Sequence, residues 1–300
     1  MRIGVGLPAA VPDVDATTIG DWAAEAEQAG FASVGVIDRL VYDNIEPLTA
    51  LAAAASRTQR VELLTTVLNV GWRANPVLLA KQIASVELLS GGRLTAGLGL
   101  GGWPDDFVAS EVPTSAGGAR MTSALATMRQ AWAGELQGGG GPMRRLPADR
   151  PTLLFGGLVP AAYVRAATEG QGWVAPLFGL QFLRDGAKAV RQAWTDAERT
   201  GRPRIVTGRY FGLGDADGVA DDYLRHYYGE QFFPAARADT LTSAARVREE
   251  LDLLADAGVT DVVLYPMTGD RRQIERLAQA LSDRLPVTTS PSSTASAVHC

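Results

Sequence analysis

The sequence predicts a single closed (β/α)8 barrel, and three observations support this fold class. Eight short apolar runs, several of them rich in β-branched residues, alternate with amphipathic segments of helical length. The alternation continues through the 300 residues without a break in composition between the two halves. Eight strand–helix units in about 285 residues also suit a closed parallel barrel better than the alternative, a doubly wound open sheet.

The first four units occupy the N-terminal half of the chain. Gly30 follows the first helix, Pro76 opens the third, and Gly91 and Gly92 come after its end, which are the usual signals for helix start and stop. The expected strands span residues 3–7, 33–37, 60–67 and 93–98, and the expected helices span residues 17–29, 47–58, 76–89 and 119–132.

The second half repeats the pattern. Its expected strands span residues 152–155, 172–175, 204–211 and 261–265, and its helices residues 160–168, 180–200, 242–257 and 271–285. Long loops are expected after the first, fourth and seventh strands, on the face where barrel enzymes carry their chemistry. The glycines at 138–141 predict a mobile surface loop without regular structure, since consecutive glycines lose much backbone entropy on ordering. We expect a barrel domain over residues 1–286 and a disordered Ser/Thr-rich tail over residues 287–300.

Composition excludes several classes of function. The net charge of −5 argues against nucleic acid as a partner, because phosphate binding needs a concentrated basic face. No run approaches the ~18 apolar residues of a membrane span, and the chain begins with a strand pattern rather than a signal peptide. The single Cys300 excludes an intramolecular disulfide, and the two histidines, His226 and His299, exclude a multi-histidine metal site. We therefore expect a cytoplasmic enzyme that acts on a small molecule, without a metal ion and without a membrane partner.

Three segments resemble the luciferase-like monooxygenase family. Residues 51–107 read LAAAASRTQRVELLTTVLNVGWRANPVLLAKQIASVELLSGGRLTAGLGLGGWPDDF, and they combine an Arg-Thr-x-Arg-Val turn, a Pro-x-x-Leu-Ala-Lys-Gln helix and Ser-Gly-Gly-Arg-Leu before a Gly-x-Gly-x-Gly strand end. Residues 151–176, PTLLFGGLVPAAYVRAATEGQGWVAP, and 242–266, TSAARVREELDLLADAGVTDVVLYP, are similar to later strand–helix units of the family. The resemblance covers nearly the whole chain in the right order, but the family spans many reactions.

The resemblance implies an oxidoreductase with a flavin at the top of the barrel. The first hypothesis is a monooxygenase that oxidises a small organic substrate with O2 and reduced FMN, which a separate flavin reductase supplies. The second is hydride transfer with coenzyme F420, a deazaflavin, without oxygen. The third is a family member that binds a flavin or another ligand without turnover. The resemblance also implies a homodimer.

Glycines at two strand ends are the candidates for cofactor binding. Gly99 and Gly101 would let the backbone approach a flat ring, whereas Gly97 is interpreted as a packing residue. Gly156, Gly157 and Leu158 precede a helix with proline in its first turn, where free backbone N–H groups are typical of a phosphate site.

Two further residues are assigned to the cofactor by resemblance. Arg120 matches an arginine that the family often has near the phosphate, and the alternative is a solvated helix residue. Asn69 lies where relatives often have a β-bulge with a non-prolyl cis peptide, so we expect a bulge near Leu68 and Asn69.

The catalytic candidates follow the second and fourth strands. Asp38-Arg39 stands where many relatives have Asp-His, and arginine cannot serve as a general base because it stays protonated. Arg39 would instead stabilise an anion, or it is a structural partner of Asp38; its presence favours FMN over the deazaflavin. Asp105, beside Asp106, is a candidate proton donor, with capping of the next turn as the alternative.

Aromatic residues and one histidine complete the set. His226 either faces the substrate or packs among its neighbouring tyrosines. Trp72 and Trp103 lie in loops at the catalytic rim and are candidate walls of the substrate pocket. Three further tryptophans on helical faces are expected in the core: Trp22, Trp132 and Trp194.

Overall fold

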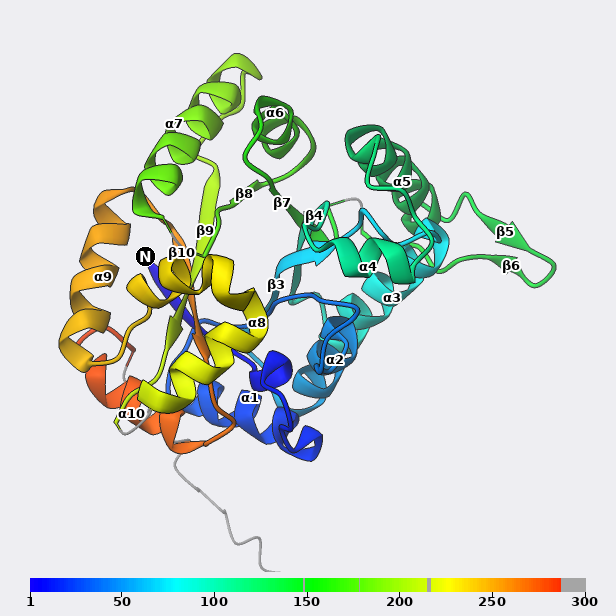
Figure 1. Ribbon diagram of the computed structural model, residues 1–300. Helices are drawn as coiled ribbons and strands as arrows, with labels where there is room; N and C mark the ends of the chain where they lie inside the picture. The colour runs from blue at the N-terminus through cyan, green and yellow to red at the C-terminus, as the bar shows by residue number, and fades with distance from the viewer. Residues whose placement is uncertain (148, 178, 215–216, 287–300) are drawn as a thin grey trace, which may run out of the picture.

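The computed structural model describes residues 1–147, 149–177, 179–214 and 217–286. Its main sheet is a closed parallel barrel with the strand order β1-β10-β9-β8-β7-β4-β3-β2, and helices surround it (Figure 1). The predicted (β/α)8 class is therefore confirmed. The division at residue 286 stays a prediction, because the expected tail lies outside the described residues.

The elements follow the expected order. The barrel strands are β1 (Arg2–Gly6), β2 (Ser33–Val36), β3 (Glu62–Asn69), β4 (Leu94–Gly99), β7 (Thr152–Gly156), β8 (Gly172–Val174), β9 (Arg204–Phe211) and β10 (Asp261–Pro266). The helices are α1 (Ile19–Gln28), α2 (Pro47–Arg57), α3 (Pro76–Leu89), α4 (Pro104–Ala109), α5 (Gly117–Trp132), α6 (Pro160–Glu169), α7 (Leu180–Asp196), α8 (Asp217–Ala238), α9 (Ala244–Asp256) and α10 (Arg272–Ala280).

Three local expectations were wrong. The segment expected as a long loop after the seventh strand contains helix α8, whose pattern is broken by the kink at Gly229 and by Pro234. The expected loop after the fourth strand contains the short helix α4. The glycine-rich segment forms an antiparallel ladder between β5 (Gln137–Gly138) and β6 (Gly141–Pro142), since two residue pairs suffice to close a hairpin with glycine turns.

The apolar side chains form two cores. The larger one lies between the strands and the surrounding helices and contains Trp22 and Trp132, as expected; Trp194 is also buried. The smaller one fills the barrel interior with Leu64, Val206 and their neighbours. This inner core continues upward to α8, drawn yellow in Figure 1, which packs Tyr223 and Tyr227 over the carboxyl ends of the strands. The barrel top is thus covered by aromatic rings.

A charged layer closes the barrel at the other end. Glu62 on β3 and Asp261 on β10 are both ion-paired with Arg204 on β9, and Arg2 joins the same two carboxylates from the surface. Burial opposes ionisation of the two acids, but hydrogen bonds and charge from Arg204 outweigh it and lower the pKa of both. The layer is a satisfied ion-pair network at the amino ends of the strands.

Arg93, in the Ser-Gly-Gly-Arg-Leu motif, holds the end of α2 in place. Its guanidinium donates to the carbonyls of Ala55, Thr58, Val61 and Ser90 at 2.7–3.3 Å and to the Thr58 hydroxyl at 3.0 Å. Positive charge beside the last carbonyls of a helix also suits the helix dipole. The motif that carried much of the resemblance therefore has a structural explanation.

Replacing Arg93 with lysine is expected to lower the free energy of unfolding by roughly 2 kcal/mol, because one ammonium cannot reach acceptors on both sides of the planar guanidinium. Urea denaturation followed by circular dichroism measures the change. Arg57→Lys is the matched control. Arg57 lies at the same end of α2 and forms an exposed ion pair with Asp21 of α1, so its replacement should change stability little. An Arg93 variant as stable as this control would contradict the capping role.

Candidate functional site

Two cavities lie at the carboxyl ends of the barrel strands. The inner cavity has a volume of about 160 Å³ and the outer cavity about 420 Å³. Both are lined by Trp103, Tyr227 and Tyr228, which therefore stand between them. The inner cavity is completed by Ile37, Asp38, Thr66, Val67, Asn69, Gly102, Leu177 and Tyr210, and the outer one by Arg39, Val41, Tyr42, Asp43, Asp105, His226 and Gly229.

A β-bulge forms the floor of the inner cavity. The register of β3 against β4 shifts between Thr65 and Leu68, and the peptide bond between Thr66 and Val67 is cis. The expected bulge near Leu68 and Asn69 is present, with its cis bond just before those residues. The bulge turns Val67 toward the inner cavity, while the Thr66 hydroxyl is hydrogen-bonded to that of Tyr265.

The strand-end glycines make room for this bulge. A Cβ on Gly99 or on Gly156 would overlap a methyl group of Val67, so both glycines let Val67 sit between β4 and β7. Gly101 has φ of +85° beside Asn69, a conformation that suits glycine. Gly102 lines the inner cavity, and no heavy atom of the described residues, its two chain neighbours aside, lies within 4 Å of where its Cβ would be. Their predicted contact with a flat ring stays a prediction.

Asp38 joins the ends of β2 and β3. Its buried carboxylate accepts the Asn69 N–H at 2.7 Å and Arg73 Nη1 at 2.5 Å, while Asn69 Nδ2 donates back to the Asp38 carbonyl at 2.9 Å. Burial raises the pKa of Asp38 against the opposing charge of Arg73. The partner of Asp38 is Arg73, so the alternative that paired it with Arg39 was wrong. Arg73 was not among the candidates, because no local pattern marks it.

Arg39 is surrounded by aromatic rings and faces Asp106 rather than Asp38. Its Nε faces the buried Asp106 carboxylate at 3.4 Å, and Nη2 donates to the Val41 carbonyl at 3.3 Å. The guanidinium carbon lies 4.1 Å from the centroid of Trp103, and the rings of Tyr42 and Tyr227 are 5.4 and 5.7 Å away.

Asp105 and Asp106, at the start of α4, lie in different environments. Asp106 is buried and accepts the Val41 N–H at 2.9 Å, whereas Asp105 is exposed and lines the outer cavity. Its candidate role as a proton donor stays a prediction, but its position at the rim leaves it far more solvated than Asp106.

Tyrosines dominate the top of the barrel. Six of the seven tyrosines in the sequence belong to one group of ring contacts: Tyr42, Tyr210, Tyr223, Tyr227, Tyr228 and Tyr265. Burial raises the pKa of Tyr42 to about 12 and raises the pKa of the others well above the ordinary value. Their hydroxyl groups therefore stay protonated at neutral pH and can donate hydrogen bonds.

His226 lies at the rim rather than in the core. It is exposed, lines the outer cavity, and its Nδ1 is 2.9 Å from the Tyr42 hydroxyl. Trp103 is a wall of both cavities. Trp72 lies instead beside a separate hollow with Leu78, and the Arg73 guanidinium lies 4.0 Å from the centroid of its ring. The predicted place of these two tryptophans in a substrate wall stays a prediction.

The predicted phosphate loop has the expected backbone form. Gly156 ends β7, Gly157 has φ of +132°, and the N–H groups of Leu158 and Val159 make no hydrogen bond within the described part of the chain. Arg120 on α5 donates to the carbonyls of Gly71 and Ser115. A phosphate contact by these residues stays a prediction.

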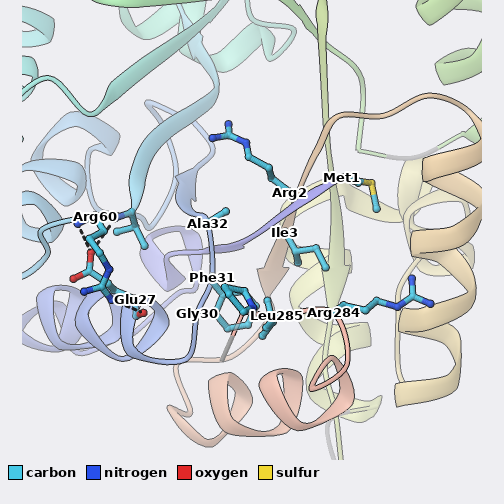
Figure 2. Close-up of a pocket in the computed structure, with 12 residues that line it drawn as sticks. Met1, Arg2, Ile3, Glu27, Gly30, Phe31, Ala32, Arg60, Arg284 and Leu285 are labelled. Carbon is cyan, nitrogen blue, oxygen red and sulfur yellow. Dashed lines mark hydrogen bonds between the residues drawn. The ribbon is translucent and has the colours of Figure 1, made fainter. Parts of the chain in front are cut away.

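A third cavity of about 330 Å³ opens at the amino ends of the strands (Figure 2). Its wall includes Arg2, Arg284 and Glu27, whose carboxylate accepts the N–H groups of Arg60 and Val61. These contacts fix the turn before β3. In (β/α)8 enzymes this end of the barrel serves stability, and the chemistry lies at the other.

Neither a metal site nor a membrane span is found in the described residues. No group of three or more His, Cys, Asp or Glu side chains within them could hold a metal ion. No helix among them is long and apolar enough to cross a membrane.

The chain is similar to known proteins in sequence and in fold. The family model described as luciferase-like monooxygenase matches residues 1–284. The F420-dependent glucose-6-phosphate dehydrogenase of Amycolatopsis mediterranei is 28% identical over 222 residues, which cover 65% of this chain and 67% of that protein.

Solved structures share the fold at lower identity. Monooxygenase RslO1 from Streptomyces bottropensis has a TM-score of 0.73 at 23% identity, and the match covers 94% of this chain and 99% of that one. An F420-dependent secondary alcohol dehydrogenase has a TM-score of 0.74 at 16% identity, covering 94% and 98%. Both likenesses show the barrel fold.

Proposed function

Because the chain belongs to the luciferase-like monooxygenase family, we propose that it is a flavin-dependent monooxygenase that oxidises a small organic substrate with reduced FMN and O2. The observation that carries the proposal is the inner cavity, where the Val67 bulge and the open space at Gly102 lie beneath a cover of tyrosine rings. Reduced FMN would supply electrons to O2 there, and the chain would supply orientation and protection from water.

The donors and walls of the inner cavity suit a flavin ring in kind, and the ring would have to widen the present volume of about 160 Å³. Val67 offers apolar methyl groups and Gly102 an open space for a flat ring, and Asn69 and the tyrosine hydroxyls offer polar contacts at its edge. The phosphate would be held by Gly156, Gly157, Leu158 and, from α5, Arg120, since two N–H groups of the loop have no hydrogen-bond partner among the described residues. Asp38 would act through Asn69, whose backbone and side chain it fixes.

The lining favours oxygenation over oxidation of an alcohol. Removing hydride from a carbinol requires a base that takes the hydroxyl proton. Among the described residues of the inner cavity, Asp38 is the one carboxylate, and it is occupied by Arg73 and Asn69. The neutral tyrosine hydroxyls can donate a proton or a hydrogen bond but cannot accept a proton at neutral pH.

Hydride transfer with coenzyme F420 is the second candidate, and the curated relatives favour it. It would need a base from outside the inner cavity. His226 in the outer cavity could serve as this base if it gave up its hydrogen bond with the Tyr42 hydroxyl. For either reaction we propose a cytoplasmic homodimer, and for the first a separate flavin reductase. The exposed Leu78 and Leu89 on α3 support a partner surface.

Titration of the protein with FMN and with F420, followed by quenching of cofactor fluorescence, tests the proposal. We expect saturable binding of FMN, and then oxygen uptake above background when reduced FMN and substrate are present together. Saturable binding of F420 alone would overturn the monooxygenase in favour of hydride transfer. Binding of FMN without any substrate-dependent oxygen uptake would leave a flavin-binding protein without turnover.

A further inference from the structure

We infer that the outer cavity binds a planar aromatic or quinoid substrate through one ionised ring hydroxyl, which Arg39 holds beside Trp103. This inference rests on the proposed function only in taking the bound molecule as the substrate. It assigns a chemical class to the substrate and a specificity role to Arg39.

The walls of the outer cavity are aromatic rings set at steep angles. Trp103 and Tyr227 meet at 88° with their centroids 5.7 Å apart, and Tyr42 and Tyr227 meet at 66° and 5.0 Å. Aromatic rings prefer edge-to-face and offset contacts, so a wall of this kind offers both edges and faces to a flat molecule. A volume of about 420 Å³ is in the range of pockets for small organic ligands.

Arg39 has one guanidinium nitrogen left for a ligand. Nε faces Asp106 and Nη2 donates to the Val41 carbonyl, while Nη1 makes no hydrogen bond with any described residue. Stacking on Trp103 fixes the plane of the group, so that little further ordering is needed when a ligand binds. A charged donor gains most from an anionic oxygen, and a phenolate or enolate oxygen on a flat ring satisfies both the arginine and the aromatic walls.

The rim limits the ligand to a single negative charge. Asp43 and Asp105 are exposed and line the same cavity, and Asp106 already faces Arg39 from below. A phosphate or a second carboxylate would meet these acids and be repelled. His226 on the rim can donate a hydrogen bond to a second ring oxygen once it releases Tyr42.

A matched pair of probes tests the inference without any variant. We expect 2-hydroxy-1,4-naphthoquinone, which is ionised at neutral pH, to bind at least tenfold more tightly than its methyl ether, 2-methoxy-1,4-naphthoquinone. Equilibrium dialysis of the full chain measures both. Equal affinity for the two probes, or no saturable binding of either, would overturn the inference.

Variants then assign the site. Arg39→Lys keeps the charge opposite Asp106 but loses the planar fork, and Trp103→Leu removes the stacking wall; each should weaken binding of the hydroxy probe about tenfold or more. Trp72→Leu is the matched control, because Trp72 also stacks on an arginine but lines another hollow. Equal weakening in the control, or unchanged binding in both test variants, would overturn the assignment.

FMN titration of the wild-type chain separates this inference from the proposed function. Probe binding without flavin binding would contradict the monooxygenase alone. Flavin binding and substrate-dependent oxygen uptake, with no preference for the hydroxy probe, would contradict the substrate class alone.

Discussion

Replacing Arg204 with methionine is expected to lower the free energy of unfolding by about 3–5 kcal/mol, the largest effect on stability that we predict for a single substitution in this barrel. The guanidinium of Arg204 donates to Glu62 and to Asp261 at 2.8 Å each, and both carboxylates are largely buried. Without Arg204 each acid keeps Arg2 as its ion-pair partner among the described residues, together with one threonine hydroxyl, and these do not offset the desolvation of two charges.

Arg2→Met is the matched control because Arg2 contacts the same carboxylates from a half-exposed position. Its loss should cost much less, since water can replace an exposed partner. Guanidinium chloride denaturation of the wild type and the two variants measures the difference. Equal losses in both variants would contradict a network centred on Arg204.

The effect should also depend on pH. The folded chain lowers the pKa of Glu62 and Asp261 from ordinary values of 4.5 and 3.8, so their contribution is present above those values and is lost as the pH falls through the lowered ones. The gap in stability between wild type and Arg204→Met should therefore shrink from neutral pH to about pH 3. A gap that stays constant over this range would contradict the role of ionised acids.

The second large effect is expected for Gly99→Ala, on cofactor binding. A Cβ at this position would overlap a Val67 methyl group, and the strand cannot move away easily because the Gly99 carbonyl accepts the Val70 N–H at 2.7 Å. Val67 would have to move into the inner cavity, whose volume is only about 160 Å³. We expect at least tenfold weaker binding of FMN and a loss of about 1–3 kcal/mol in stability from the overpacking.

Fluorescence titration and thermal melting measure these two changes. Gly118→Ala is the matched control, because Gly118 lies in α5 with no heavy atom within 4 Å of its Cβ position. This variant should bind FMN as the wild type does and should be slightly more stable, since alanine favours a helix over glycine. Wild-type affinity for FMN in Gly99→Ala would show that Val67 does not border the cofactor.

The barrel could be predicted because its signals are local. Each strand is a short apolar run, and several surrounding helices begin with a proline, as α2, α3 and α6 do. Helix α8 lacked such a signal, since Gly229 and Pro234 interrupt it and its buried face combines Tyr223 and Tyr227 with Leu224. Its type was therefore missed although its position after the seventh strand was recognised.

The site could be predicted in its location but not in its pairings. Asp38 and Arg39 were recognised as adjacent candidates, yet their partners, Arg73 and Asp106, come from 35 and 67 positions further along the chain. No local pattern links such residues, because barrel closure brings the strand ends together. The choice between Asp105 and Asp106 likewise depends on which side of α4 faces the barrel, and a helix of six residues gives too short a pattern to decide this.

The open space at Gly102 has a consequence for the size of the inner cavity. The Gly102 backbone is not in the left-handed region, and its Cβ would meet no heavy atom of another described residue, so alanine or serine there would shorten the inner cavity without disturbing the bulge, the ion pairs or the barrel. One substitution at residue 102 can therefore change the room for a flat ring while the barrel keeps its stability.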